Sequence, residues 1–264
     1  LTEMRDKGLD YKEVLQSAQE LGYAEADPTL DVNGWDQAHK AIILASMAAG
    51  GWVDPARVQV EGVEKVRRVD IDFVEKLGYT IKLLAVIKLG EEREVEVRVQ
   101  PSLISKQHLL AAVNDVYNAV LVRGHVSGDT LYYGSGAGQD PTTSAVLADV
   151  VSGARLLGQT PDNRQPFPHE AARVLPINET RSNYYLRVKV ANENGVLAQV
   201  AAVIGQNDAG VTSVYQPLAD QDSADLVFII GDATFGQLKR AIAGISALSC
   251  TRGEPTLLRM EILD

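Results

Sequence analysis

The chain has one cysteine, Cys250, among its 264 residues. A single cysteine excludes an intramolecular disulfide and offers no spacing of metal ligands, so we expect no metal site and a reducing, cytoplasmic setting. Long apolar runs are also lacking, because no stretch approaches the roughly 18 residues of a membrane span. We therefore expect no membrane partner.

Positive charge is in the minority. The 25 Lys and Arg residues face 35 Asp and Glu residues, which gives a formal net charge of −10 at pH 7. No run of Lys or Arg forms a basic stripe, and the sequence pI is about 4.9. These features argue against nucleic acid and anionic membranes as partners.

An initiator methionine and a signal peptide are lacking as well, since the chain opens on Leu1-Thr-Glu-Met. We therefore expect a piece of a longer protein. Its length still suffices for two domains and a sizeable core. Hydrophobic residues make up 45% and charged residues 23%, which is ordinary for a soluble globular protein.

The most informative stretch is residues 21–40, where four acidic side chains and one lysine gather. Pro28 and the Asn33-Gly34 pair predict a turn-rich loop, and the apolar residues that follow predict a helix from about Trp35 to Ala49. Loop acids that lead into an apolar helix with one lysine suit a small, polar, positively charged substrate. These residues are Glu25, Asp27, Asp31, Asp36 and Lys40.

Asp36 and Lys40 stand four residues apart on this helix, which permits two interpretations. One is a surface ion pair worth about 0.3–0.5 kcal/mol. The other is a general base, because a helix apolar nearly all round is expected to be buried. Burial and the helix dipole disfavour the ammonium form of Lys40, whereas Asp36 favours it, and the residues leave the outcome open. His39 is the rival base, although a surface or capping histidine is the favoured interpretation.

The loop acids taken singly are structural candidates, with Asp31 or Asn33 as a cap of the helix. Taken together, they would suit a substrate ammonium group. The segment Gly134-Ser-Gly-Ala-Gly138 opens onto a second helix, from about Pro141 to Leu157, and such a loop favours anions. It carries only part of the dinucleotide fingerprint, and tight packing explains its glycines nearly as well.

Alternating residues predict strands over Thr80–Leu89 and Glu94–Val99 and a hairpin of 119–122 with 130–133. In the second strand, valines alternate with charged residues, which is typical of a half-exposed antiparallel strand that Pro101 ends. Residues 159–182 contain four prolines and indicate a linker. Residues 183–264 follow the order βαββαβ, a ferredoxin-like unit.

The expected fold class is therefore α/β (α+β). A first domain, residues 1–158, has helices packed on a largely antiparallel or mixed sheet. The linker, 159–182, joins it to the ferredoxin-like domain, 183–264.

Three segments carry a resemblance to a known family. Residues from Gly22 to Lys40 (Gly-Tyr-Ala-Glu-Ala-Asp-Pro-Thr-Leu-Asp-Val-Asn-Gly-Trp-Asp-Gln-Ala-His-Lys) closely resemble the signature of homoserine dehydrogenase. The segment from Gly134 to Val146 resembles that family's second glycine-rich segment. Residues 183–264 look like the ACT regulatory domain of many bacterial members. The resemblance covers essentially the whole chain.

The resemblance implies NAD(P)-dependent, reversible oxidation of L-homoserine to L-aspartate 4-semialdehyde, on the way to threonine, methionine and isoleucine. Lys40 matches the catalytic lysine, and Glu25, Asp31 and Asp36 match acids that bind the substrate or orient it. Positions of cofactor contact are Gly138 and Thr142, with Gly136 and Ala137 beside them. A homodimer or homotetramer is implied as well.

Two departures from the family pattern stand out. The N-terminal nucleotide-binding domain is missing, so we expect NADP or NAD to be bound mainly outside this chain and the chain alone to be inactive. In the ACT unit, Asn192-Glu-Asn-Gly195 replaces the Asp-x-Pro-Gly of many members, so threonine binding at Asn192 and Gly195 is a hypothesis. The alternative function is a non-catalytic, amino-acid-sensing ACT module with a dimerisation domain.

Overall fold

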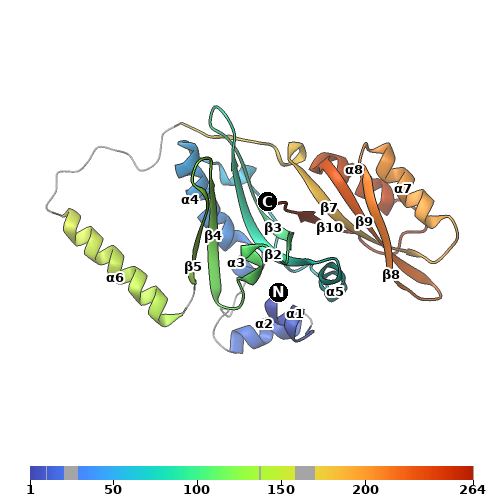
Figure 1. Cartoon of the computed structure of the whole chain (residues 1–264), viewed down its shortest axis with the longest axis horizontal. Coiled ribbons are helices and arrows are strands. Elements are labelled where there is room, and N and C mark those ends of the chain that lie inside the picture. Colours follow the sequence, from blue (N-terminus) through green and yellow to red (C-terminus); the bar gives the residue numbers. More distant parts are fainter. Residues whose placement is uncertain (10, 21–28, 137, 158–169, 264) are drawn as a thin grey trace.

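Figure 1 shows the fold of the protein, a computed structural model that describes residues 1–9, 11–20, 29–136, 138–157 and 170–263. Helices pack on a mixed sheet, which confirms the predicted α/β class. The described α-helices are α1 (Thr2–Asp6), α2 (Tyr11–Glu20), α3 (Thr29–Val32), α4 (Trp35–Ala49), α5 (Arg68–Lys76), α6 (Gln139–Leu156), α7 (Val196–Gln206) and α8 (Phe235–Ser246). Short 3-10 turns cover Pro55–Arg57, Leu109–Ala112 and Ile177–Glu179.

One sheet runs through both halves of the chain. Its strands are β1 (Gln59–Val60), β2 (Tyr79–Leu89), β3 (Glu94–Ser105), β6 (Arg173–Val174), β7 (Arg181–Ala191), β8 (Val211–Ala219), β9 (Ser223–Thr234) and β10 (Thr256–Met260). The order is β1-β3-β10-β7-β9-β8, and β2 and β6 also pair with β3. A separate hairpin consists of β4 (Tyr117–Gly124) and β5 (Gly128–Ser135).

Strand β3 is longer than the sequence predicts, because Pro101 does not end it. The β2 side of β3 is paired from Val95 to Ser105, past Pro101. On the other side, the carbonyls of Val99 and Leu103 accept hydrogen bonds from the chain after β1 and after β10. Pro101 lies between these two points, so the N–H that it lacks removes no bond to β2.

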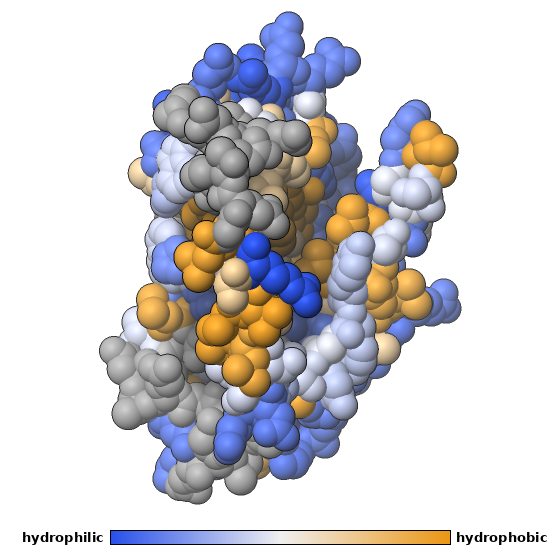
Figure 2. All heavy atoms as spheres, turned by 90° about the vertical axis from the view of Figure 1, so that its left-hand side faces the viewer, coloured by the Kyte–Doolittle hydropathy of each residue, from blue (hydrophilic) through white to orange (hydrophobic). Residues whose placement is uncertain are grey.

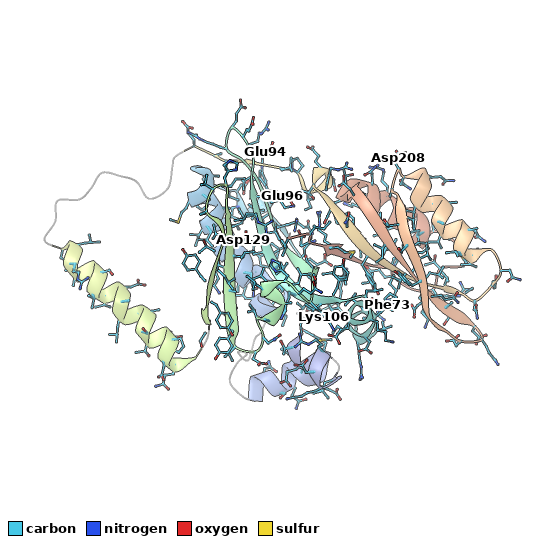
Figure 3. All side chains as sticks on the ribbon, viewed as in Figure 1. Phe73, Glu94, Glu96, Lys106, Asp129 and Asp208 are labelled. Carbon is cyan, nitrogen blue, oxygen red and sulfur yellow. The ribbon has the colours of Figure 1, made fainter. Side chains whose placement is uncertain are left out.

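The polar side of β3 is buried, which corrects the expectation of a half-exposed strand. Arg98 is fully buried; its Nε donates to Glu96 Oε1 at 2.7 Å, and its Nη1 and Nη2 donate to Glu261 at 2.8 and 3.1 Å. Figure 3 marks Glu94 and Glu96 on this strand. Alternating charge predicts a side that faces water only where no other part of the chain covers it. Here Glu261, the residue that follows β10, covers Arg98.

Helix α4 is confirmed, but it is not buried all round. One side packs on β2 and β3 through Ala38, Ala41, Ile42 and Ala45. The other side leaves Ile43, Leu44 and Met47 exposed. Figure 2, which looks at the left-hand side of Figure 1, where α4 and α6 lie, shows hydrophobic residues at the surface. No described segment covers this second side, so its apolar residues face solvent.

The C-terminal half has the predicted order of elements, β7-α7-β8-β9-α8-β10. Its strands lie in the order β10-β7-β9-β8, and both helices pack against them over one apolar cluster. Strand β10 continues the sheet into the first half, because Arg259 and Met260 pair in parallel with Ser102 and Leu103 of β3. The domain boundaries expected from the sequence stay a prediction.

Candidate active site

The start of α4 is fixed by close backbone contacts with the sheet. Gly34 has a φ of 85° and lies against the backbone of Glu61, where a Cβ would come within 3.3 Å of the carbonyl oxygen. Only glycine combines that conformation with that approach. The N-cap of α4 is Gly34, and no side chain caps the helix there, so the expected cap by Asp31 or Asn33 is wrong. The Asn33 side chain instead accepts a hydrogen bond from the Trp35 amide at 3.1 Å in the turn before the helix.

Asp36 and Lys40 form the predicted ion pair on the outer side of this helix. Lys40 Nζ donates to Asp36 Oδ2 at 2.6 Å, and the two side chains are 69% and 40% exposed. The lysine is therefore not buried, contrary to one of the two interpretations of the sequence. An exposed pair contributes little stability, and its ammonium group is accessible to a ligand.

The structure describes only some of the other candidate residues near α4. His39 is exposed, and its ring lies at 5.7 Å from the Trp35 ring with a tilt of 45°, as expected of a surface histidine. Glu25 and Asp27 fall outside the described residues. Of Asp31 the backbone is described, in α3 directly before α4. The structure thus brings together Asp36 and Lys40 and places Asp31 in the element that precedes them.

The glycine-rich loop connects the β4–β5 hairpin to α6. The Gly136 amide donates to Val116 O at 3.1 Å, and Gly138, with a φ of 120°, caps α6. Ala137 lies outside the described residues. A shallow hollow of about 570 Å³ opens beside the first turns of α6 and is lined by Gly138, Gln139, Thr142, Thr143, Val146 and Leu147. Helix α4, the hairpin and α6 all lie in the left-hand part of Figure 1.

The hollow fits part of a dinucleotide cofactor. It combines the first turn of an 18-residue helix, whose free amides attract anionic groups, with the apolar side chains of Val146 and Leu147. It is widely open to solvent, and its lining comes from Gly138 and α6 alone. Among the described residues, no three His, Cys, Asp or Glu side chains gather as metal ligands would. None of the described helices is long and apolar enough to span a membrane.

The effector candidates lie between β7 and α7. Asn192 Nδ2 donates to Asp220 O at 2.7 Å, and Gly195 caps α7 with a φ of 87°. The Asp220 carboxylate accepts bonds from the amides of Asp222 and Ser223 and from the Ser223 hydroxyl. The bonds from Ser223, followed by the Asp222 amide, lower the pKa of Asp220. The loop beside Asn192 is therefore held by its own hydrogen bonds.

Sequence reasoning missed a buried charge cluster between α5 and β7. Arg187 donates to both carboxylate oxygens of Asp70, at 2.6 and 3.0 Å, and to Asp225 Oδ1 at 3.2 Å. The Tyr185 hydroxyl also donates to Asp70, at 2.9 Å. Burial, and then the Asp70 charge, raise the pKa of Tyr185. Asp70 lies more than a hundred positions from Tyr185 and Arg187, and Asp225 lies 38 positions from Arg187, so no local pattern indicates them.

Comparison with known proteins gives a consistent result. A family model described as homoserine dehydrogenase matches residues 1–151. A homoserine dehydrogenase of Neisseria gonorrhoeae is 42% identical over 271 residues, and one of Pseudomonas aeruginosa is 40% identical over 272 residues. Each alignment covers 100% of this chain and 62% of the relative, so the chain spans about three fifths of their length.

Solved structures agree with the sequence comparison. The crystal structure of a homoserine dehydrogenase from Thiobacillus denitrificans superposes with a TM-score of 0.89 at 38% identity, over 100% of this chain and 61% of that chain. The homoserine dehydrogenase of S. aureus, in crystals at pH 6.0, gives a TM-score of 0.70 at 28% identity, over 99% of this chain and 62% of that chain.

Proposed function

The chain belongs to the homoserine dehydrogenase family, and we propose that it carries the substrate side of a site for reversible oxidation of L-homoserine to L-aspartate 4-semialdehyde. The observation that carries this proposal is the accessible Lys40–Asp36 pair at the start of α4. The pair adds little to stability, which leaves it available for chemistry. The reaction would stand on the route to threonine, methionine and isoleucine.

Lys40 is the proton-transfer group in this proposal. In the oxidation direction, its Nζ in the neutral amine form takes the proton of the homoserine hydroxyl and becomes the ammonium, while the carbon that bears this hydroxyl gives up a hydride. In the reverse direction, the Lys40 ammonium returns the proton to the aldehyde oxygen. When bound, NAD or NADP supplies the hydride acceptor. Asp36, which already accepts a hydrogen bond from Lys40, holds the lysine in position.

The acids before the helix bind the amino-acid end of the substrate. Glu25, Asp31 and Asp36 provide carboxylates for the substrate ammonium group, and charge-assisted hydrogen bonds of this kind are the strong ones. Such a site favours a substrate with a free α-amino group. The proposal therefore predicts poor use of an alcohol that lacks this group.

Gly136, Ala137, Gly138 and Thr142 form the cofactor side of the site. The hollow at the start of α6 supports this role, because it offers helix amides and an apolar wall. It is a single wall, so we propose that NAD or NADP is held mainly by a nucleotide-binding domain outside this chain. The length of the relatives leaves room for such a domain.

We propose residues 183–264 as an ACT regulatory domain after a first domain of 1–158 and a linker of 159–182. An effector such as threonine would bind near Asn192 and Gly195. Titration calorimetry of the chain with threonine tests this directly, and absence of heat would leave the unit as an assembly module.

We also propose that the protein assembles into a homodimer or homotetramer and that it is located in the cytoplasm. The exposed apolar residues of α4 (Ile43, Leu44, Met47) and of the hairpin (Val120, Val122, Tyr132) support assembly, because apolar patches of this kind are typical of interfaces. Analytical ultracentrifugation of the chain tests it, and a monomer at all concentrations would contradict it.

The proposed function is tested by Lys40→Ala in the complete protein that contains this sequence, assayed with homoserine and NADP or NAD. We expect the rate to fall by about 10²–10⁴-fold, as for loss of a general base. Lys7→Ala is the matched control, since Lys7 makes the same kind of pair with Glu3 at 2.6 Å, with exposures of 60% and 39%.

Activity of the Lys40→Ala protein within a few-fold of wild type would contradict the mechanism. Such a result, together with threonine binding to the chain, would favour the alternative of a non-catalytic sensing module.

A further inference from the structure

Two segments meet backbone to backbone at the turn that leads into α4. Segment 61–63 follows β1, and the Val63 amide donates a hydrogen bond to Val32 O at 2.9 Å. A Cβ added to Gly62 would lie 2.5 Å from Asn33 Cα and closer still to the Val32 carbonyl oxygen. Because both neighbours belong to the main chain, no side-chain rotation could make room for a methyl group there.

The requirement for glycine at position 62 is one of space. Among the described residues, the glycines with a positive φ include Gly34 and Gly78 but not Gly62. The contact is also reciprocal, because a Cβ added to Gly34 would lie 3.3 Å from Glu61 O. Each of the two segments therefore has a glycine where it faces the other.

Segment 61–63 is the fixed side of this contact. Val60 pairs with Val99 of β3, and the Glu61 amide donates to Val99 O at 2.8 Å. Val99 is fully buried in the sheet. On the facing side, α3 has only four residues, and Leu30 is 59% exposed. A side chain at position 62 would therefore displace α3 and the turn after it, rather than the sheet.

Such a displacement would separate two parts of the proposed substrate site. Asp36 and Lys40 stand on α4, which packs on the sheet and carries both of them. Asp31 belongs to α3, and its neighbour Val32 is the residue that Gly62 contacts. A misplacement of about 1 Å can cost about 10²-fold where several groups must meet one substrate.

We propose that Gly62 is a positioning residue for the substrate site. Its lack of a side chain lets α3, which carries Asp31, lie at a fixed place before the helix of Lys40. The inference rests on the role proposed above for Asp31 in binding the substrate ammonium group. Gly62 touches neither substrate nor cofactor in this proposal and acts through the backbone of Val32 and Asn33.

The test is steady-state oxidation of homoserine by the Gly62→Ala form of the complete protein that contains this sequence, with NADP or NAD at saturation. We expect KM for homoserine to rise about tenfold, since Asp31 moves away from the place of the ammonium group. We expect kcat at saturating homoserine to stay within about threefold of wild type, since Asp36 and Lys40 keep their places on α4.

This split distinguishes positioning from a loss of folded protein. A variant that is only less stable contains less active enzyme, which lowers the apparent kcat and leaves KM unchanged. That pattern, or wild-type values of both constants, would overturn the proposal.

The other end of α4 supplies a matched control. A Cβ added to Gly51 would lie 3.0 Å from the Ala172 amide nitrogen, and the Trp52 amide donates to Glu170 O at 2.8 Å. Gly51 is thus a second glycine packed against neighbouring backbone, but it follows the end of the helix opposite to Lys40. Gly51→Ala should leave KM for homoserine unchanged.

Hydrogen exchange of the wild-type protein, resolved to single amides, decides the question if Gly62→Ala does not fold. The Val63 amide should exchange as slowly as the Glu61 amide, which is bonded to the sheet. Fast exchange at Val63 would show that segment 61–63 does not hold the turn, and the proposal would be wrong.

The outcomes separate this inference from the proposed function. If the wild-type protein does not oxidise homoserine, the proposed function fails and the inference fails with it. If it does, and Gly62→Ala has the KM of wild type, the inference alone is wrong.

Discussion

Two regions bury their apolar residues to different degrees: the C-terminal half, from β7 to β10, and helix α6. In the first, α7 and α8 cover a continuous cluster that includes Leu186, Phe228 and Leu238. In the second, α6 has no buried residue along its described length, although it has 18 residues and α8 has 12. Figure 3 shows the side chains of α6 standing away from the rest of the molecule.

Helical patterning explains part of this difference, because the apolar residues of α6 are spread around the helix more evenly than those of α8. In α8, Leu238, Ala241 and Ile245 follow the spacing of three and four and are buried. In α6, Val146 and Val150 follow the same spacing and are exposed. A stripe therefore predicts burial only where the same chain supplies the surface that covers it.

Buried charges show the same contrast. The Asp70–Arg187 pair is buried between α5 and β7, whereas Asp36–Lys40 and Asp232–Arg181 face solvent. Removing one partner of a buried pair leaves the other charge without compensation, and an exposed partner is simply hydrated. The buried pair is therefore a structural group, and the exposed Asp36–Lys40 pair is free for chemistry.

The largest effect on stability should come from breaking the buried pair. Asp70→Ala should lower the free energy of unfolding by about 3–5 kcal/mol, because Arg187 and the Tyr185 hydroxyl lose their main partner. Denaturant titration of the 264-residue chain measures it. Asp232→Ala, which removes an exposed partner of Arg181 at 2.9 Å, is the control and should cost far less. Equal costs for both would contradict the comparison.

The next prediction compares α8 and α6 by making the same Leu→Ala change in each. Leu238→Ala in α8 should cost about 3 kcal/mol, because this side chain is fully buried. Leu147→Ala in α6 deletes the same atoms from an exposed residue and should cost less than about 0.5 kcal/mol. Thermal and denaturant unfolding of the two variants measure the difference. A large cost at Leu147 would show that α6 is packed in solution.

These contrasts show what the sequence can predict. Spacing within one segment located α4 and placed Asp36 beside Lys40, since both depend on the backbone of a single helix. The sequence did not predict pairs between distant segments, such as Asp70 with Arg187 and Arg98 with Glu261. The exposed side of α4 was also missed, because exposure depends on which surfaces the rest of the chain provides.

A smaller effect concerns pH. Burial raises the pKa of Tyr184 from 10.0 to about 12, so the folded state favours the neutral phenol. The unfolded chain releases this proton first as pH rises, and the contribution is therefore complete below pH 10 and lost between pH 10 and about 12. Urea unfolding at a series of pH values should show the fall.

Tyr184→Phe provides the control for that experiment. Its hydroxyl is buried without a hydrogen-bond partner in the described part of the chain, so its loss should cost little at neutral pH. The fall in stability over the same pH range should become shallower. An unchanged slope would show that Tyr184 does not titrate in this range.

The most direct test of the account is homoserine oxidation by the purified 264-residue chain, at saturating homoserine with NADP and with NAD. A cooperative melting curve first establishes that the chain is folded. The account predicts no turnover above that of its Lys40→Ala variant, because the chain supplies Lys40 and one wall of the cofactor site only. Turnover by the chain that Lys40→Ala abolishes would contradict the claim that the cofactor is bound mainly outside it.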